Sequence, residues 1–304
     1  MDIPTPSTGT LSVVRSFVPA RDDLLFKKVF SDEHHSDLLV ELLRPVLKLD
    51  DADCKAVTLP NTHTLAAQPQ DKTAVMDVKV TTATGKHIAI EVILRTTRDL
   101  PQRLVYYNAS MVTSQMVRGA SYDTINQTIC LVFADFVMFD DEAYHHTFTF
   151  HDRHTDTTLT DVAVIHVVEL PKLSDEPDGT VEWQWMKFLA ANTPEEMAMA
   201  AADNPHIARA AVAVSHYNAD EQFRYELDAH ERFLHDQASR QRTAHLDGYD
   251  EGLAEGHAAG LEDGERRKAV FVARNLLSTG MTVEQVAALT GLDAADVSQL
   301  SQEQ

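Results

Sequence analysis

Two apolar segments joined by a glycine-containing loop constrain the fold of this chain more than any other feature. Residues 74–80 alternate in polarity with a period of two, and residues 87–94 form a second apolar run. A period of two is typical of a β-strand whose two faces differ. The loop Ala83-Thr84-Gly85 suits a three-residue hairpin turn, because glycine readily adopts the positive φ that such a turn requires. The sequence therefore predicts a β-hairpin.

The length of the loop also predicts the register of the hairpin. Thr82 should pair with Lys86, and pairs counted outward from the loop then place Asp77 opposite Glu91. Directly opposed side chains lie about 5 Å apart, and two carboxylates that close repel unless a proton or a cation lies between them. Oxygen ligands on a rigid hairpin suit Mg²⁺ or Mn²⁺. The alternative is a solvent-facing hairpin with two unrelated acids.

An Asp on one strand and a Glu on the next resemble the core of the PD-(D/E)XK nucleases. More narrowly, the chain is similar to the Rpn-type family of recombination-promoting nucleases and transposases, over about residues 23–300. The matching pieces are residues 23–30, Val75-Met76-Asp77-Val78, Ile90-Glu91, Arg103-Leu104-Val105-Tyr106-Tyr107, residues 165–172 and the glycine-spaced tail. Each piece is short, so the resemblance depends on their order and spacing.

The resemblance implies a restriction-endonuclease-like α/β fold, with a mixed central β-sheet flanked by helices. It also implies metal-dependent hydrolysis of DNA phosphodiester bonds, linked to recombination or transposition. Asp77 and Glu91 would bind the metal and take part in catalysis. Asp23, at the start of the first predicted helix, would be a third metal ligand; the alternative is that it only caps that helix.

One position of the second strand departs from the family. The family has Glu-x-Gln there and other relatives have Glu-x-Lys, whereas this chain has Glu91-Val92-Ile93. An apolar side chain therefore stands where a polar one should position the water or stabilise charge. Arg95, two residues further on the same face, or Lys79, two residues beyond Asp77, could substitute in catalysis. The alternative is a catalytically inactive relative that works as a binding or assembly module.

Four further residues are candidates for DNA contact. Lys27 and Lys28 of the predicted first helix could reach phosphate groups or could simply be solvated. Arg103 and Tyr107 match the family's Arg-x-x-Tyr-Tyr on a helix predicted over residues 102–118. Arg103 could contact the DNA backbone or pin an active-site carboxylate, and a purely structural ion pair is the alternative.

The charge of the chain bears on its partners. The 304 residues include 47 Asp and Glu against 26 Lys and Arg, a net charge of −21. DNA affinity comes largely from cations that neutralise phosphates, so this charge opposes strong DNA binding unless basic residues gather at the cleft. We still expect DNA as the partner, from the resemblance. The N-terminus does not read as a signal peptide and no apolar run could span a bilayer, so we expect a cytoplasmic protein without membrane partners.

Composition divides the chain into three parts. Residues 1–18, rich in Pro, Thr and Ser, predict a flexible arm, residues 19–238 the nuclease-like domain, and residues 239–304 a helical tail with a helix-turn-helix-like end. Glycines at 248, 252, 256, 260 and 264 lie on nearly one helix face, which favours a homo-oligomer or, alternatively, a frayed connector. Residues 293–304 contain no Lys or Arg, so we expect the last helix to be structural rather than to read bases.

Overall fold

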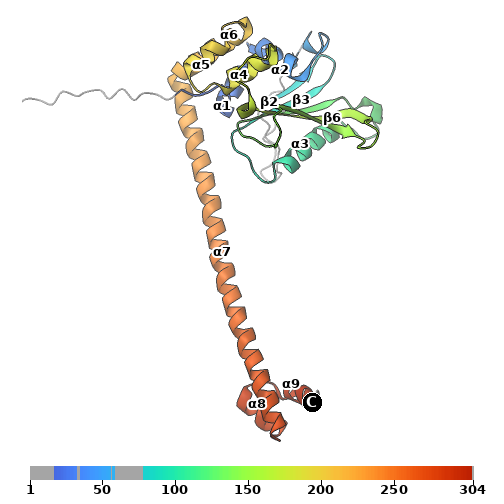
Figure 1. The fold of residues 1–304 in the computed structure, drawn as a ribbon, viewed down its shortest axis with the longest axis vertical. Coiled ribbons are helices and arrows are strands. Elements are labelled where there is room, and N and C mark those ends of the chain that lie inside the picture. The colour runs from blue at the N-terminus through green and yellow to red at the C-terminus, as the bar shows by residue number, and fades with distance from the viewer. Residues whose placement is uncertain (1–16, 33–34, 56, 59–77, 303–304) are drawn as a thin grey trace, which may run out of the picture. The chain divides into compact units, whose positions relative to one another are not determined.

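The computed structural model describes residues 17–32, 35–55, 57–58 and 78–302 (Figure 1). The chain divides into two compact units, Met1–Leu227 and Asp228–Gln304. The strands are β1 (Val57–Thr58), β2 (Val78–Thr82), β3 (His87–Ile93), β4 (Thr128–Ala134), β5 (His145–His151) and β6 (Thr158–Glu169). The helices are α1 (Asp23–Phe30), α2 (Ser36–Leu47), α3 (Leu100–Ser114), α4 (Val181–Ala190), α5 (Pro194–Ala200), α6 (Pro205–Ala219), α7 (Glu221–Ser278), α8 (Val283–Thr290) and α9 (Ala294–Gln302). None of the helices in these ranges has both the length and the apolarity that crossing a bilayer requires.

A mixed six-stranded sheet forms the centre of the first unit. Its order is β1-β2-β3-β4-β6-β5, with β3, β4 and β6 parallel and the other neighbours antiparallel. Every residue of β4 is buried, as expected for a parallel strand covered on both faces. The expectation of a mixed sheet flanked by helices is confirmed.

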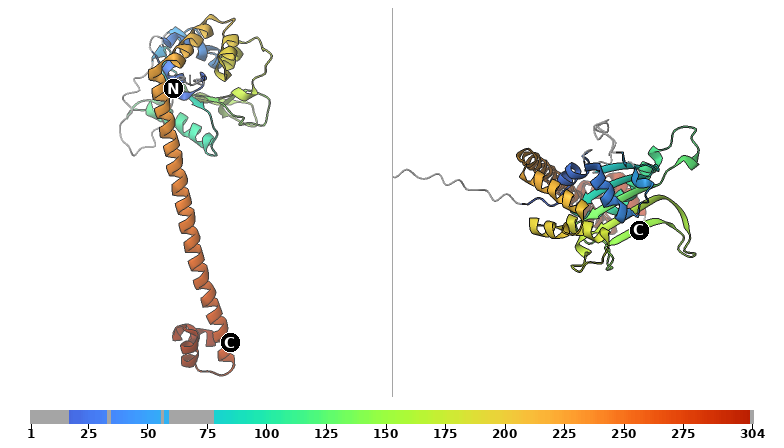
Figure 2. Two further views of the ribbon diagram at one scale, coloured as in Figure 1. Left: turned by 90° about the vertical axis from the view of Figure 1, so that its left-hand side faces the viewer. Right: turned by 90° about the horizontal axis from the view of Figure 1, so that it is seen from above.

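Helices cover both faces of this sheet. In Figures 1 and 2, α3 lies on one face, and α1, α2 and α4 lie on the other. The larger core cluster lies on the α1 side and includes Val80, Ile90 and Phe26. The smaller cluster lies on the α3 side and includes Ile93 and Leu104. Because side chains alternate along a strand, the odd-numbered residues of β3 face α3.

The hairpin formed by β2 and β3 has the predicted register. Its described pairs are Val78↔Ile90, Lys79↔Ala89, Val80↔Ile88 and Thr81↔His87. The Thr82 amide donates to the Lys86 carbonyl at 3.0 Å, and Gly85 has a φ of +91°, a conformation that glycine adopts without a Cβ clash. Asp77 lies outside the described residues, so its position opposite Glu91 stays a prediction.

A buried aspartate holds the turn of this hairpin against the segment before β1. Asp53 is 0% exposed, and its carboxylate accepts a hydrogen bond from Lys86 Nζ at 2.7 Å and another from the Thr84 hydroxyl. Desolvation raises the pKa of Asp53, but the bonds from Lys86 and Thr84 outweigh it, so the pKa lies below its ordinary value. The turn is therefore fixed by a charged contact as well as by its own backbone.

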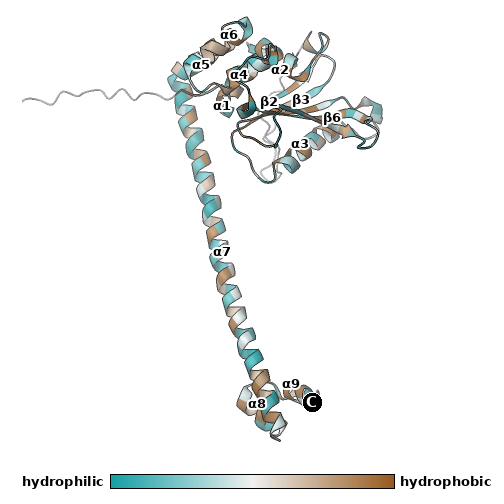
Figure 3. Ribbon diagram, in the orientation of Figure 1, coloured by the Kyte–Doolittle hydropathy of each residue, from teal (hydrophilic) through white to brown (hydrophobic). Residues whose placement is uncertain are grey.

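The second unit is helical. α7 is one continuous helix of 58 residues, which begins in the first unit and passes through all five tail glycines, where we had considered a frayed connector. Figure 3 shows hydrophilic and hydrophobic positions interspersed along it. The expected capping box is present, with Thr282 and Gln285 bonded reciprocally at the start of α8, and Gly291 ends that helix at a φ of +72°. Ala273, Val286 and Val297 join α7, α8 and α9 in a small core.

Candidate functional site

Glu91 is the carboxylate around which the candidate site is built. It lies in β3 beside Val132 of β4, and its side chain points toward α3 and is 8% exposed. A carboxylate buried to this degree requires a compensating charge. Arg103 of α3 provides one, since its Nη2 lies 3.9 Å from Glu91 Oε2. The structure therefore joins two predicted site residues from segments that are separate in the sequence.

Tyr107 lies one helical turn beyond Arg103, and its ring centroid is 6.0 Å from Arg103 Cζ. Burial raises the pKa of Tyr107, and the negative charge of Glu91 adds to that effect. The same two causes raise the pKa of the buried Cys130 thiol to about 12. Near neutral pH both groups are therefore uncharged, and Tyr107 keeps its hydroxyl proton available for donation. The ion pair with a carboxylate, one of the alternatives for Arg103, is present; contact of Arg103 and Tyr107 with DNA stays a prediction.

Ile93 shows how position 93 is used in this chain. Its side chain is 8% exposed and belongs to the apolar cluster that contains Leu100 and Leu104 of α3. The residue therefore fastens α3 to the sheet. A glutamine or lysine there would leave this cluster or bury a polar group in it.

Arg95 and Lys79 were expected to supply the cation that position 93 lacks. Arg95 lies beyond the end of its strand, whereas Lys79 lies within one. β3 ends at Ile93, and Arg95 is an exposed residue in the bend that follows. The alternation of side chains along a strand therefore does not extend to Arg95, and that argument for placing it beside Glu91 was wrong. Lys79 pairs with Ala89, so it shares the sheet face of Glu91 but lies nearer to the hairpin turn.

The first helix carries the remaining candidates. Asp22, not Asp23, caps α1, because its side chain accepts from the Leu25 amide at 3.0 Å. Asp23 Oδ2 lies 3.9 Å from Lys27 Nζ. Lys28 forms an ion pair with Glu226, in which Nζ and Oε2 are 2.8 Å apart. The apolar residues of α1 pack in the cluster on the sheet face opposite to α3. Within the described ranges, no three His, Cys, Asp or Glu side chains group as a metal site; the expected set of Asp23, Asp77 and Glu91 includes a residue outside them.

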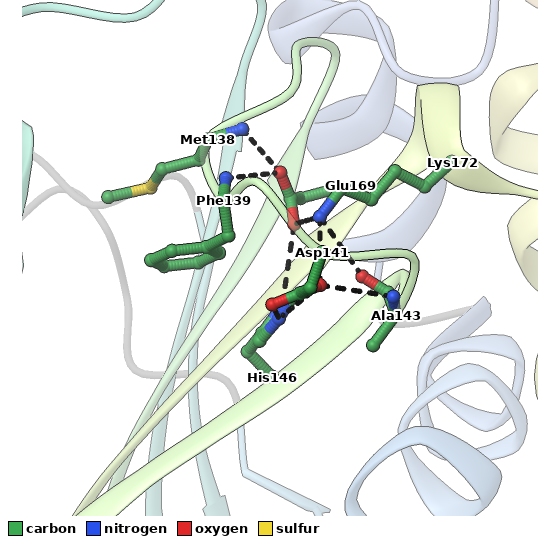
Figure 4. Close-up of polar contacts among 7 residues, drawn as sticks. All are labelled: Met138, Phe139, Asp141, Ala143, His146, Glu169 and Lys172. Atoms are coloured by element: carbon green, nitrogen blue, oxygen red, sulfur yellow. Dashed lines mark hydrogen bonds and ion pairs between the residues drawn. The ribbon is translucent and has the colours of Figure 1, made fainter.

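A second buried carboxylate lies at the end of β6 (Figure 4). Glu169 is 0% exposed, and Figure 4 shows its carboxylate between two backbone amides and the side chains of Lys172 and His146. The amides of Met138 and Phe139 donate to one oxygen. Lys172 Nζ lies 2.7 Å and His146 Nδ1 3.4 Å from the other. The resemblance to the family includes residues 165–172, which hold Glu169 and Lys172, but it predicts no role for either residue.

This cluster supports the wall of the candidate site. Glu169 pairs with Ala134, which in turn pairs with Ile93, so the three residues form one row across the sheet. The loop between β4 and β5, which Glu169 holds, packs Met138 and Phe139 on the apolar cluster of Ile93. We therefore read Glu169 and Lys172 as structural residues that fix the cluster beside Glu91.

Comparison with known families identifies the chain. A family model described as PD-(D/E)XK nuclease family transposase matches residues 20–244. The chain belongs to this family. A second model, described as the Rpn/YhgA-like nuclease family, C-terminal HTH domain, matches residues 266–302. Searches of curated proteins and of solved structures gave no match. Membership of an Rpn-type PD-(D/E)XK family supports a nuclease-like function in transposition or recombination.

In this Rpn-type chain the helix-turn-helix match covers the end of α7 with α8 and α9. Its basic residues, Arg266, Arg267, Lys268 and Arg274, all lie on α7, whereas α9 carries none. Arg266 and Arg267 form ion pairs with Asp296 and Asp263 at 3.5 and 2.6 Å. A helix-turn-helix beside a nuclease domain suggests DNA as a partner, but α9 offers no cation for phosphates or for guanine edges.

Proposed function

We propose that the chain is a metal-dependent DNA endonuclease that acts in recombination or transposition, with Asp77 and Glu91 as the ligands of Mg²⁺ or Mn²⁺. The register of the hairpin carries this proposal. Its described pairs run outward to Val78↔Ile90, and one further pair in the same register would bring Asp77 opposite Glu91. Membership of the nuclease family supports the same pairing.

The residues around Glu91 fit a divalent cation. Glu91 is nearly buried beside Arg103, and a carboxylate held on a strand is a suitable ligand for an ion that accepts one or two protein carboxylates and keeps several waters. Bound Mg²⁺ would polarise a phosphate oxygen and lower the pKa of an attacking water. Two facing carboxylates would hold that ion where a DNA strand crosses the α3 side of the sheet.

The other candidates keep narrower roles in the proposal. Asp23, expected as a third ligand, begins a helix that packs on the sheet face opposite to α3, so it would have to reach the ion from the other side of the sheet from Glu91. Lys27, Lys28, Arg103 and Tyr107 would contact the DNA backbone, although Lys28 would first have to leave Glu226. Arg95 and Lys79 remain candidates for stabilising charge on the phosphate, Lys79 with the better-defined face.

Plasmid nicking by the full-length protein tests the proposal. We expect conversion of supercoiled DNA to open circles with Mg²⁺ or Mn²⁺ at low salt, where phosphate contacts are strongest, and none with a chelator. Asp77→Ala and Glu91→Ala should each abolish it. Glu142→Ala, which removes an exposed acid of the same unit, is the matched control and should cleave like wild type. Equal residual nicking by wild type and Asp77→Ala would refute the proposal.

The competing proposal is a catalytically inactive relative that serves as a binding or assembly module. The packing of Ile93 in an apolar cluster and the net charge of −21 favour it. The nicking assay separates the two, because an inactive module would bind a partner but would leave plasmid supercoiled at every metal concentration.

A further inference from the structure

The proposed reaction requires a cation that the β3 strand does not supply. Negative charge builds on the scissile phosphate during hydrolysis, and positioned donors aimed at that charge supply much of the catalysis. The family places a glutamine or lysine two residues after the second acid, but Ile93 fills that position and is packed in the α3 cluster. Arg95 lies beyond the end of the strand, and Lys79 lies toward the hairpin turn.

We propose that Arg103 of α3 is the missing charge-stabilising residue and donates to the scissile phosphate. This inference rests on the proposed nuclease function and adds to it the residue that replaces the usual strand side chain. The cation would thus come from a helix that packs over the site and not from β3 itself.

The geometry of Arg103 carries the proposal. Its Nη2 lies 3.9 Å from Glu91 Oε2, which is longer than the 2.7–2.9 Å or so of a charge-assisted hydrogen bond, so Glu91 does not use up the donors of the guanidinium. Its Nε is buried and has no hydrogen-bond partner among the residues that the structure describes. About a third of the side chain, 33%, is exposed, so solvent and a phosphate group can reach it.

The chemistry of the group agrees with this role. A guanidinium presents five donors in a planar fork that matches two oxygens of one phosphate, and it stays charged at any pH of interest. The ring of Tyr107, with its centroid 6.0 Å from Cζ, limits where the guanidinium can swing, by a cation–π contact. The donors are therefore held close to the carboxylate that would bind the metal, without being consumed by it.

Ile93 helps to position Arg103. Leu104, the neighbour of Arg103 on α3, packs with Ile93 and Leu100 in one cluster. The apolar residue at position 93 thus fixes the helix that carries the cation. The departure from the family pattern and the position of Arg103 are two parts of the same arrangement.

The test compares Arg103→Ala, Arg103→Lys and Arg98→Ala in full-length protein, with plasmid nicking, Mn²⁺ affinity by calorimetry and thermal unfolding measured on each. Arg98 is an exposed arginine just before α3 and serves as the control. We expect Arg103→Ala to lower kcat about 100-fold, the usual effect of losing one such donor, and free guanidinium ion at millimolar concentration to restore part of it. Arg103→Lys should retain more activity than Arg103→Ala, and Arg98→Ala should match wild type.

Metal affinity separates catalysis from mere support of Glu91. If Arg103 acts on phosphate, Arg103→Ala binds Mn²⁺ as tightly as wild type or more tightly, because a competing cation near Glu91 is gone. Weaker Mn²⁺ binding in proportion to the lost cleavage would overturn the inference, as would equal losses in Arg98→Ala. If Arg103→Ala cleaves at the wild-type rate and Asp77→Ala does not cleave, the inference about Arg103 is wrong and the proposed nuclease function stands. If wild type, Asp77→Ala and Arg103→Ala nick plasmid at the same rate, both the inference about Arg103 and the proposed nuclease function are wrong.

Discussion

Ile93 shows how the packing of one residue limits the chemistry open to its neighbour. The sequence alone showed that position 93 is apolar and shares a face with Glu91. It could not show that this side chain anchors α3 through Leu100 and Leu104, because that contact joins segments whose packing depends on the whole fold. The same limit applies to Glu91. Its strand position predicts a metal ligand, but the sequence left open whether Arg103 contacts Glu91, as it does at 3.9 Å, or contacts DNA instead.

Replacing Ile93 by glutamine tests both sides of this residue. We expect Ile93→Gln to raise cleavage several-fold if the site is only impaired, since the amide could position a water or stabilise charge. It should also destabilise the protein by roughly 1–3 kcal/mol, because a buried amide without a full set of partners costs about that much. Ile93→Val, which keeps the site apolar, is the control for packing. Nicking rates that do not differ among wild type, Ile93→Gln and Ile93→Val would exclude a role for position 93 in catalysis.

At the scale of elements, local rules predicted the hairpin well and the helices less well. Loop length and Gly85 were enough for the register of β2 and β3, because a tight turn dictates its own pairing. The end of β3 at Ile93 could not be predicted, and the argument for Arg95 failed there. α7 continues through five glycines although each glycine weakens a helix; from the sequence, a self-associating helical tail and a frayed connector were both open.

Asp53 predicts how the hairpin responds to acid. Its pKa is lowered in the folded protein, so its contribution to stability is fully present above its ordinary pKa of 3.8 and is lost as the pH falls through the lower folded value. We expect the free energy of unfolding of wild type to fall more steeply below about pH 4 than that of Asp53→Asn, while Asp53→Asn is the less stable protein at pH 7. Urea unfolding at several pH values measures this. Parallel pH profiles would mean that Asp53 is not coupled to folding.

The tail glycines predict opposite effects within and between chains. A Cβ added at Gly252 or Gly256 would meet nothing within 4 Å among the described residues. The double variant Gly252→Ala/Gly256→Ala should therefore stabilise the helical state of α7 by a free energy of about 1 kcal/mol per site. If these glycines allow a second copy to approach, the same change should weaken self-association. Circular dichroism and sedimentation velocity together test this. A more stable helix with unchanged mass would show that the glycine face makes no contact between chains.

For the whole molecule, the division between the nuclease-like part and the helical tail stays a prediction. The units change at Leu227 and Asp228, whereas composition suggested residue 239, and the nuclease family model extends to residue 244. α7 passes through all of these positions, so no loop marks a boundary. We propose that residues from about 240 onward are separable from the nuclease-like part and drive self-association.

Truncation tests that division. Protein ending at Arg240 should stay folded, because the described residues of the sheet's core clusters reach no further than Leu227, and it should sediment as a smaller assembly than the full chain. The truncation removes the exposed apolar residues Tyr249, Leu253 and Leu261 of α7. Their loss should remove the proposed contact between copies of the chain. An assembly of unchanged subunit number would leave the tail as a linker to the helix-turn-helix end.

The central claim is that Asp77 and Glu91 face each other and share one divalent cation. Calorimetric titration of Mn²⁺ into full-length wild type, Asp77→Asn, Glu91→Gln and the double variant tests it most directly, because it does not depend on catalysis. We predict one site per chain in wild type, at least tenfold weaker binding in each single variant, and a double variant hardly weaker than either, as expected of residues that act on one ligand. Wild-type affinity in both single variants would contradict the claim.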